Sequence, residues 1–205
     1  MIITSKPGSP GKIHIYIDGE YTLTLYDDYW YLSGIKEGQS ITEDELAALK
    51  EEAGFRSAYE KALRLLTVRP YSEKELTDKL CIKFPKESVR RAVEKVAGYG
   101  YIDDEAYALE YARHLFEKKK YDIKRIRTEL KIKGINTETT DKILKTLDNE
   151  PIPRIIDMIG SKYPDGFPSP KEQKRFTSKL MRMGYSFSDI RAAYSESGFE
   201  ICGEE

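Results

Sequence analysis

Three leucines recur at an interval of fifty residues, and each one closes a basic segment with a helical pattern. These segments end at Leu80, Leu130 and Leu180. A fixed period of this length is typical of one helical unit that is used three times. Such a unit cannot bury its apolar face alone, so neighbouring copies must pack on one another. The period therefore predicts a helical repeat protein with a long contact surface, which favours a binding role over a catalytic one.

The first forty residues follow a different period, that of β-strands. Ile13, Ile15 and Ile17 alternate with polar residues, and Asp18-Gly19 then supplies the positive-φ pair of a tight hairpin turn. Residues 21–25 are expected to form the returning strand, and residues 29–32 a third strand. The sequence thus predicts a small β-rich module before the repeats.

The pattern becomes helical after this module. Thr42 and Glu45 have capping-box spacing, which predicts a short helix that Gly54 ends. From Ser57 onward each repeat contains three helical segments, and in the first repeat Leu76, Leu80 and Ile82 are expected on a buried face. The predicted fold is mainly α, with three tandem three-helix repeats in an elongated, curved array behind the β-rich module. The expected divisions are a β-hairpin or meander module with a short helix at 1–56, repeats at 57–100, 101–150 and 151–199, and a polar, mobile tail at 200–205.

Composition limits the function classes that remain. The 205 residues carry a net charge of −1, so the chain as a whole is not drawn to a polyanion. The two cysteines have no metal-site spacing and indicate a reducing compartment. The start of the chain has no signal-peptide pattern, and no apolar run is long enough to cross a membrane. We therefore expect a cytoplasmic protein without a membrane segment.

Charge is unevenly distributed along the chain. Residues 1–56 carry five basic residues and ten acidic ones, whereas residues 113–133 carry nine basic residues and three acidic ones. Lysines and arginines on a helix are usually just a solvated face, but Lys124, Arg127 and Lys131 share one side of the predicted helix. We therefore interpret this segment as a candidate partner-binding surface. Its basic residues are Arg113, Lys118, Lys119, Lys120, Lys124, Arg125, Arg127, Lys131 and Lys133.

Basic residues in the other two repeats are candidates for corresponding patches. In the third repeat these are Lys174, Lys179 and Arg182. In the first repeat Lys74, Arg90 and Arg91 could continue the surface, although a solvated face explains them equally well.

No catalytic constellation is evident. Asp103, Asp104 and Glu105 are adjacent, so their side chains diverge around a helix, and their position suits the helix N-terminus better than acid–base chemistry. His14 and His114 have no apparent catalytic partner, and there is no glycine-rich phosphate loop. We expect a protein that is not an enzyme and that uses no metal or other cofactor.

Several strings resemble one known family. The stretch Gly100–Ala108, which reads GYIDDEAYA, and the later Glu129–Ile135, which reads ELKIKGI, are similar to motifs of the RecX family of bacterial recombinase regulators. Arg69–Leu76 resembles the family's entry motif, Met183–Arg191 matches the third repeat, and Tyr16–Tyr21 resembles an N-terminal extension of some members. The resemblance thus extends over nearly the whole chain.

The chain departs from the family at two places. A segment rich in proline and glycine, Pro164–Pro170, is inserted in the third repeat, where it would alter the angle of that repeat. Lys119-Lys120-Tyr121-Asp122 stands where many members have a glycine, so we expect the backbone to approach a partner less closely there.

The resemblance implies a negative regulator of the RecA recombinase. Members bind along the groove of the RecA–DNA filament, contact more than one protomer, and suppress ATPase, strand exchange and coprotease activity. The implied partners are RecA and the RecA–DNA filament, which a monomer of this chain would contact. The alternative is a helical nucleic-acid-binding protein that acts directly on DNA, although the near-neutral charge predicts only weak direct binding.

Overall fold

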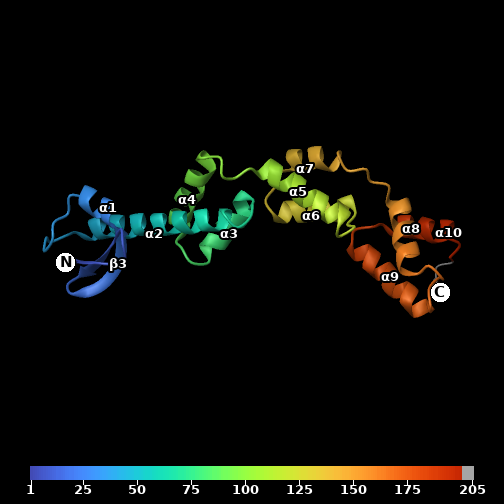
Figure 1. Ribbon diagram of the computed structural model, residues 1–205, viewed down its shortest axis with the longest axis horizontal. Helices are drawn as coiled ribbons and strands as arrows, with labels where there is room; N and C mark the ends of the chain where they lie inside the picture. The colour runs from blue at the N-terminus through green and yellow to red at the C-terminus, as the bar shows by residue number, and fades with distance from the viewer. Residues whose placement is uncertain (200–205) are drawn as a thin grey trace. The chain divides into compact units, whose positions relative to one another are not determined.

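The computed structural model describes residues 1–199, which form ten α-helices and one three-stranded sheet (Figure 1). The chain divides into two compact units, one from Met1 to Asp103 and one that begins at Asp104. The predicted mainly helical fold with a small β-rich start is confirmed. The tail predicted at 200–205 lies outside the described residues.

An antiparallel sheet opens the first unit. Its order is β1-β2-β3, and the turn between β2 and β3 is the predicted Asp18-Gly19 pair, with φ angles of 49° and 89°. Ile3, Ile15 and Leu25 are buried on one face, where Leu49 of the following helix covers them. The strands are β1 (Ile3–Pro7), β2 (Lys12–Ile17) and β3 (Glu20–Tyr26).

The strand predicted at residues 29–32 is wrong. This segment belongs to helix α1 (Asp27–Leu32), and the third strand of the sheet is β1. The carboxylate of Asp27 accepts the N–H of Asp28, and that of Asp28 accepts the N–H of Tyr29, both at 2.7 Å. Two acids at the N-terminus thus satisfy N–H groups that a helix leaves open, and they suit its dipole. Trp30 is buried against the sheet.

The prediction that a helix ends at Gly54 is wrong. Helix α2 (Glu43–Leu66) passes through it without a break, beginning with the predicted Thr42–Glu45 capping box. A Cβ at Gly54 would lie 2.5 Å from Oγ of Ser88 in helix α4 (Lys86–Gly98). The glycine therefore permits close packing of two helices, and α2 joins the sheet to the first group of three helices.

This first trio consists of α2, α3 (Glu73–Cys81) and α4. Ser72 caps α3 by accepting the N–H of Glu75, as predicted. Leu76 and Leu80 are buried in the core of the trio, but Ile82 is 79% exposed because it follows the last turn of α3. The prediction that Ile82 is buried is therefore wrong.

The second trio opens the second unit. Asp122 caps α6 by accepting the N–H of Lys124 at 2.9 Å, and Asn136 caps α7 by accepting that of Thr139 at 2.8 Å. Ala112, Ile126 and Leu130 lie at the centre of its core. The helices are α5 (Asp104–Glu117), α6 (Ile123–Ile132) and α7 (Thr137–Leu144).

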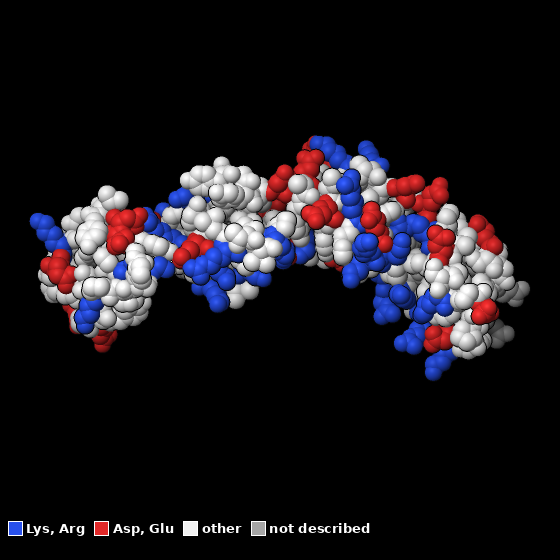
Figure 2. Space-filling view, viewed as in Figure 1, with Lys and Arg blue, Asp and Glu red and all other residues white. Residues whose placement is uncertain are grey.

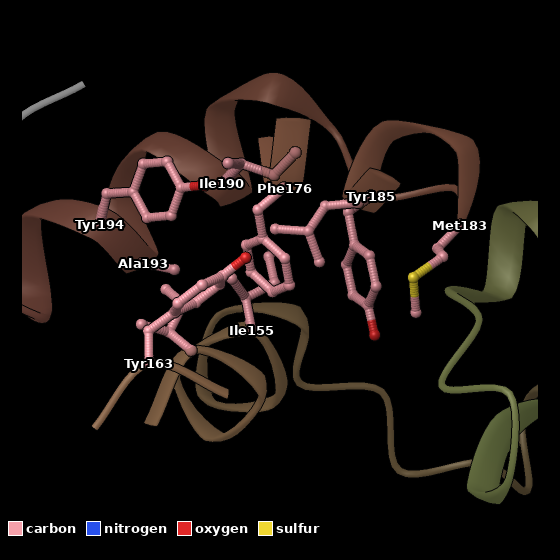
Figure 3. Close-up of a cluster of buried hydrophobic side chains, with 10 residues drawn as sticks. Ile155, Tyr163, Phe176, Met183, Tyr185, Ile190, Ala193 and Tyr194 are labelled. Atoms are coloured by element: carbon pink, nitrogen blue, oxygen red, sulfur yellow. The ribbon is translucent and has the colours of Figure 1, made fainter. Parts of the chain in front are cut away.

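The third trio has an aromatic core, drawn in Figure 3. Ser169 caps α9 with Pro170 at its first position, as the sequence predicts. Phe176, Tyr185 and Tyr194 are buried in this core. Its helices are α8 (Pro151–Lys162), α9 (Pro170–Arg182) and α10 (Phe187–Glu196).

The leucines that define the sequence period occupy equivalent places. Leu80, Leu130 and Leu180 are each at most 1% exposed, and each lies near the end of the second helix of its trio. The residue boundaries predicted between the repeats stay predictions.

Candidate functional site

The cations of the first trio are held in ion pairs. Arg91 contacts Glu51 at 2.8 Å and Glu52 at 3.1 Å, and Lys74 contacts Asp78 at 2.5 Å. Arg90 lies between Glu87 and Glu94, and its hydrogen bond lowers the pKa of Glu87. These three candidates are therefore neutralised by neighbouring acids within their own unit.

The cations of α6 are divided between two roles. Arg125 pairs with Glu129 at 2.6 Å, and Arg127 pairs with Asp141 of α7. Lys124 and Lys131 are exposed on the same side of α6 as Arg127, and in residues 1–199 neither takes part in an ion pair. We call Lys124, Arg127 and Lys131 the α6 face. Two of its three charges are available to a partner.

The loop between α5 and α6 carries three consecutive lysines in a constrained backbone. Lys120 has a φ of 58°, in the left-handed region that side chains other than glycine rarely adopt. The hydroxyl of Tyr185, from the third trio, donates to the carbonyl of Lys120 at 2.8 Å. Burial raises the pKa of Tyr185, which keeps this hydroxyl protonated as a donor. The third trio thus fixes the backbone that presents these lysines.

Arg154 of α8 holds the same loop from another direction. Its Nη2 donates to the carbonyl of Phe116 at 2.9 Å, and its guanidinium lies 3.4 Å from the centre of the Phe116 ring. Its Nε approaches the hydroxyl of Tyr185 at 3.3 Å. Arg154 thereby joins the end of α5 to the core of the third trio.

The second and third trios also meet through backbone contacts. The N–H of Asp122 donates to the carbonyl of Met183 at 2.9 Å. Gly184, with a φ of 102°, lies so close to Arg125 that a Cβ would be 2.7 Å from Cβ of the arginine. Figure 3 shows Met183 and Tyr185 at the edge of the aromatic core, toward the preceding segment. These contacts make the joint between the trios a tightly packed one.

A hollow of about 530 Å³ opens beside this joint. The half-buried Met158 contributes apolar surface to it, the buried Phe176 and Met183 lie behind its wall, and Asp157 is the one acid among its described lining residues. Its cations are Lys118, Lys119, Lys120, Arg154, Lys162 and Lys179. Among the described residues, no ion pair involves any of these six.

A second hollow, of about 300 Å³, adjoins the first. The two share Lys162, Phe176 and Lys179, and the second adds Arg175 and Arg182. We call the two hollows together the basic trench. Over the second unit, Figure 2 shows lysine and arginine side chains gathered around α6 and α9. This surface can attract anionic groups, which are its natural ligands.

The sequence-predicted candidates separate into three groups. Lys118, Lys119, Lys120, Lys179 and Arg182 line the basic trench. Lys124, Arg127 and Lys131 form the α6 face. The others lie elsewhere: Arg113 and Lys174 are exposed outside the trench, Arg125 packs at the joint, and Lys133 lies 5.6 Å from the ring centre of Tyr111.

Three trench cations were missed from the sequence, namely Arg154, Lys162 and Arg175. The one available signal was spacing, because Arg154, Met158 and Lys162 follow one another at intervals of four residues along α8. Nothing in the sequence placed that side of α8 beside the lysine loop.

Other kinds of site find no support in residues 1–199. In that range no group of three or more His, Cys, Asp or Glu side chains is arranged to hold a metal ion. No helix there has the length and apolar character needed to cross a membrane.

Comparisons with known proteins point to one family. A model of the first three-helix domain of RecX matches residues 58–95. A regulatory protein RecX of Caldanaerobacter subterraneus subsp. tengcongensis is 30% identical over 197 residues, covering 94% of this chain and 98% of the relative. A regulatory protein RecX of Clostridium acetobutylicum is 27% identical and covers 95% of this chain and 94% of its own.

Solved structures share the fold. A crystal structure of regulatory protein RecX aligns with a TM-score of 0.61 at 24% identity, covering 95% of this chain and 98% of that one. A RecX structure from Lactobacillus salivarius aligns with a TM-score of 0.52 at 20% identity, covering 70% of this chain and 96% of that one.

Proposed function

Because this chain belongs to the RecX family of regulatory proteins, which are not enzymes, we propose that it regulates the RecA recombinase. It binds as a monomer along the groove of the RecA–DNA filament in the cytoplasm. There it suppresses ATP hydrolysis, strand exchange and coprotease activity, and it requires no cofactor. It acts by blocking filament growth or promoting disassembly.

The distribution of ion pairs is the observation that supports this proposal most. The first trio neutralises its candidate cations internally, whereas the lysines of the α6 face and of the basic trench have no ion-pair partner among residues 1–199. Several weak contacts on linked trios gain affinity through effective concentration. Charged surfaces also steer association in a manner that salt weakens.

Filament binding by charge-reversed variants tests the proposal. We expect Lys124→Glu with Lys131→Glu to weaken binding to RecA assembled on single-stranded DNA roughly tenfold, because two attractive contacts become repulsive. Arg127 is left in place, since its loss would also break its ion pair with Asp141. The measurement is the anisotropy of a labelled filament as the protein is added.

The matched control is Lys145→Glu with Lys171→Glu, which makes the same charge change at exposed positions of the same unit that lie outside the α6 face. This control should bind like the wild type. Equal binding by both double variants and the wild type would remove the α6 face from the proposed interface.

The second candidate function is direct action on DNA without a recombinase. The concentration of cations in the basic trench favours it as the alternative. Counterion release would then give a steep salt dependence on bare DNA. Titration of single-stranded and double-stranded DNA, each with and without RecA, separates the two functions.

A further inference from the structure

The basic trench collects positive charge that the described part of the chain does not compensate. Its cations come from three separate segments, namely the lysine loop after α5, helix α8 and helix α9. Like charges that converge on one hollow repel one another, and Asp157 is the one acid among the described residues that line either hollow. The trench therefore favours an anionic segment that several of its lysines can contact at once.

The sequence supplies such a segment directly after the last residue that the structure describes. Residues 200–205 contain three glutamates, Glu200, Glu204 and Glu205, and no lysine or arginine. We call these six residues the acidic segment. Its charge is opposite to that of the trench, and both belong to the second unit of the chain.

Phe199 is the residue from which the acidic segment starts. Its N–H donates to the carbonyl of Tyr194 at 2.8 Å, and its ring centre lies 5.3 Å from that of Phe167. These two contacts hold Phe199 against the third trio, whose aromatic core is drawn in Figure 3. Because Phe167 lies between α8 and α9, the acidic segment starts beside the connection of these two helices.

Short ring contacts lead from this starting point to the trench. The ring centre of Phe167 lies 4.5 Å from that of Tyr163, and Nζ of Lys162 lies 4.8 Å from the ring centre of Tyr163. Lys162 lines both hollows of the trench. An extended chain spans about 3.3 Å per residue, so the acidic segment can reach roughly 20 Å, further than these contacts taken together. Its glutamate side chains add to that reach.

We propose that the acidic segment binds the basic trench of its own molecule and competes there with other anionic ligands. A short tether gives the segment a high effective concentration at the trench, so weak contacts are enough for occupancy. Each of its glutamates replaces repulsion between neighbouring cations with attraction, and added salt weakens this effect. A ligand of higher charge displaces the segment.

The consequence for regulation rests on the proposed function. The apparent affinity of any ligand of the trench falls in proportion to the fraction of molecules in which the trench is free. A filament that contacts the trench must therefore displace the acidic segment first. The segment thus sets a threshold, which a partner with several contacts overcomes and a weakly bound anion does not.

Zero-length cross-linking tests the contact directly. A carbodiimide joins a carboxylate to a lysine amine only where the two groups meet, and mass spectrometry of the peptides identifies the pair. In the full chain at low salt we expect links from Glu204 or Glu205 to Lys162 or Lys179, with a yield that does not depend on protein concentration. A yield that rises with concentration would place the segment on a second copy, and links only to lysines outside the trench would also overturn the proposal.

Binding of inorganic tripolyphosphate, measured by titration calorimetry, tests the competition. Glu200→Gln with Glu204→Gln and Glu205→Gln should tighten binding roughly threefold at low salt, because more molecules then have a free trench. The gain should disappear in a chain that also carries Lys162→Gln and Lys179→Gln, since two substitutions that remove one contact are not additive. An undiminished gain in that chain would contradict a contact with the trench.

The control variant carries Glu110→Gln, Asp148→Asn and Glu196→Gln. It removes three negative charges from exposed positions of the same unit that are not among the described residues lining either hollow. It should bind tripolyphosphate like the wild type, and an equal gain in both triple variants would refute the proposal. Inhibition of RecA is measured separately. Its absence in the wild type would refute the proposed function, whereas missing cross-links refute the role of the acidic segment alone.

Discussion

At the residue scale, Lys120 is a lysine in a backbone conformation that is better suited to glycine. Its φ of 58° lies in the left-handed region, which favours glycine. The lysine adds a cation to the basic trench at the expense of local strain. We interpret this as a loss of folding stability that is accepted because the lysine adds a positive charge. Single substitutions at this position can measure both effects.

Replacing Lys120 by glycine should make the protein more stable and weaken its binding of anions. Relief of the left-handed strain, about 1–2 kcal/mol, outweighs the added freedom of the unfolded chain, about 0.4–1 kcal/mol. We expect a net gain of roughly 0.5–1 kcal/mol in the free energy of unfolding, measured with urea. Affinity for RecA assembled on single-stranded DNA should fall in the same variant, because a cation of the basic trench is lost.

Lys119→Gly is the control for this prediction, because Lys119 is not among the described residues with a positive φ. It should lower the free energy of unfolding. Were Lys120→Gly to destabilise the protein as much as Lys119→Gly, strain at Lys120 would be refuted.

At the scale of elements, the carboxylate of Glu60 adds polar contacts to the apolar packing between the sheet and α2. Glu60 of α2 accepts the hydroxyl proton of Tyr26 from β3 at 2.6 Å. It also contacts Lys12 of β2 at 3.3 Å and Arg64 at 2.9 Å. The hydrogen bond from Tyr26, followed by those from Arg64 and Lys12, lowers the pKa of Glu60 from 4.5 to about 2. The ionised form is thus preferred in the folded state.

This lowered pKa predicts a stability change in acid. A carboxyl whose pKa is lower in the folded state adds stability above its unfolded pKa and loses it as pH falls toward the folded value. The free energy of unfolding should therefore fall between about pH 4.5 and 2, and less steeply in Glu60→Gln. The effect is modest, because the Glu60 side chain is 38% exposed to screening water. Parallel pH curves for the two proteins would show that Glu60 does not join these elements.

Local signals made most of the helical elements predictable. The caps Thr42, Ser72, Asp122 and Ser169 lie within a few residues of the N–H groups that they bind, so the sequence alone contains the interaction. Gly54 was misinterpreted because a glycine that ends a helix and one that admits a neighbouring helix look the same in sequence. The close approach of Ser88 decides between them, and this is a tertiary contact.

The candidate site was predictable only in part, for the same reason. Runs of lysine such as 118–120 are visible in the sequence, as is Lys179. Arg154 was missed because its role depends on the carbonyl of Phe116, 38 residues earlier. The pairing of Arg91 with Glu51 was also invisible, because 40 residues separate them, whereas the pairs of Arg90 could have been predicted from the acids at helical spacing on both of its sides. Sequence patterns locate charge, but folding decides which charges stay available.

At the scale of the whole molecule, the small net charge results from segments of opposite charge. The total of −1 combines an acidic N-terminal segment with more basic repeats. A nearly neutral protein has little nonspecific electrostatic affinity for DNA. Its basic surfaces therefore contribute to binding mainly where contacts with a partner protein add to them. This arrangement suits a regulator that recognises an assembled filament more than one that coats free nucleic acid.

ATP hydrolysis by RecA on single-stranded DNA, measured with this protein added in substoichiometric amounts, tests the regulatory role most directly. One bound molecule that contacts several protomers should lower the rate by more than its molar share, and added salt should weaken the effect. An unchanged rate of hydrolysis, under conditions where the protein is folded and RecA is active, would contradict it.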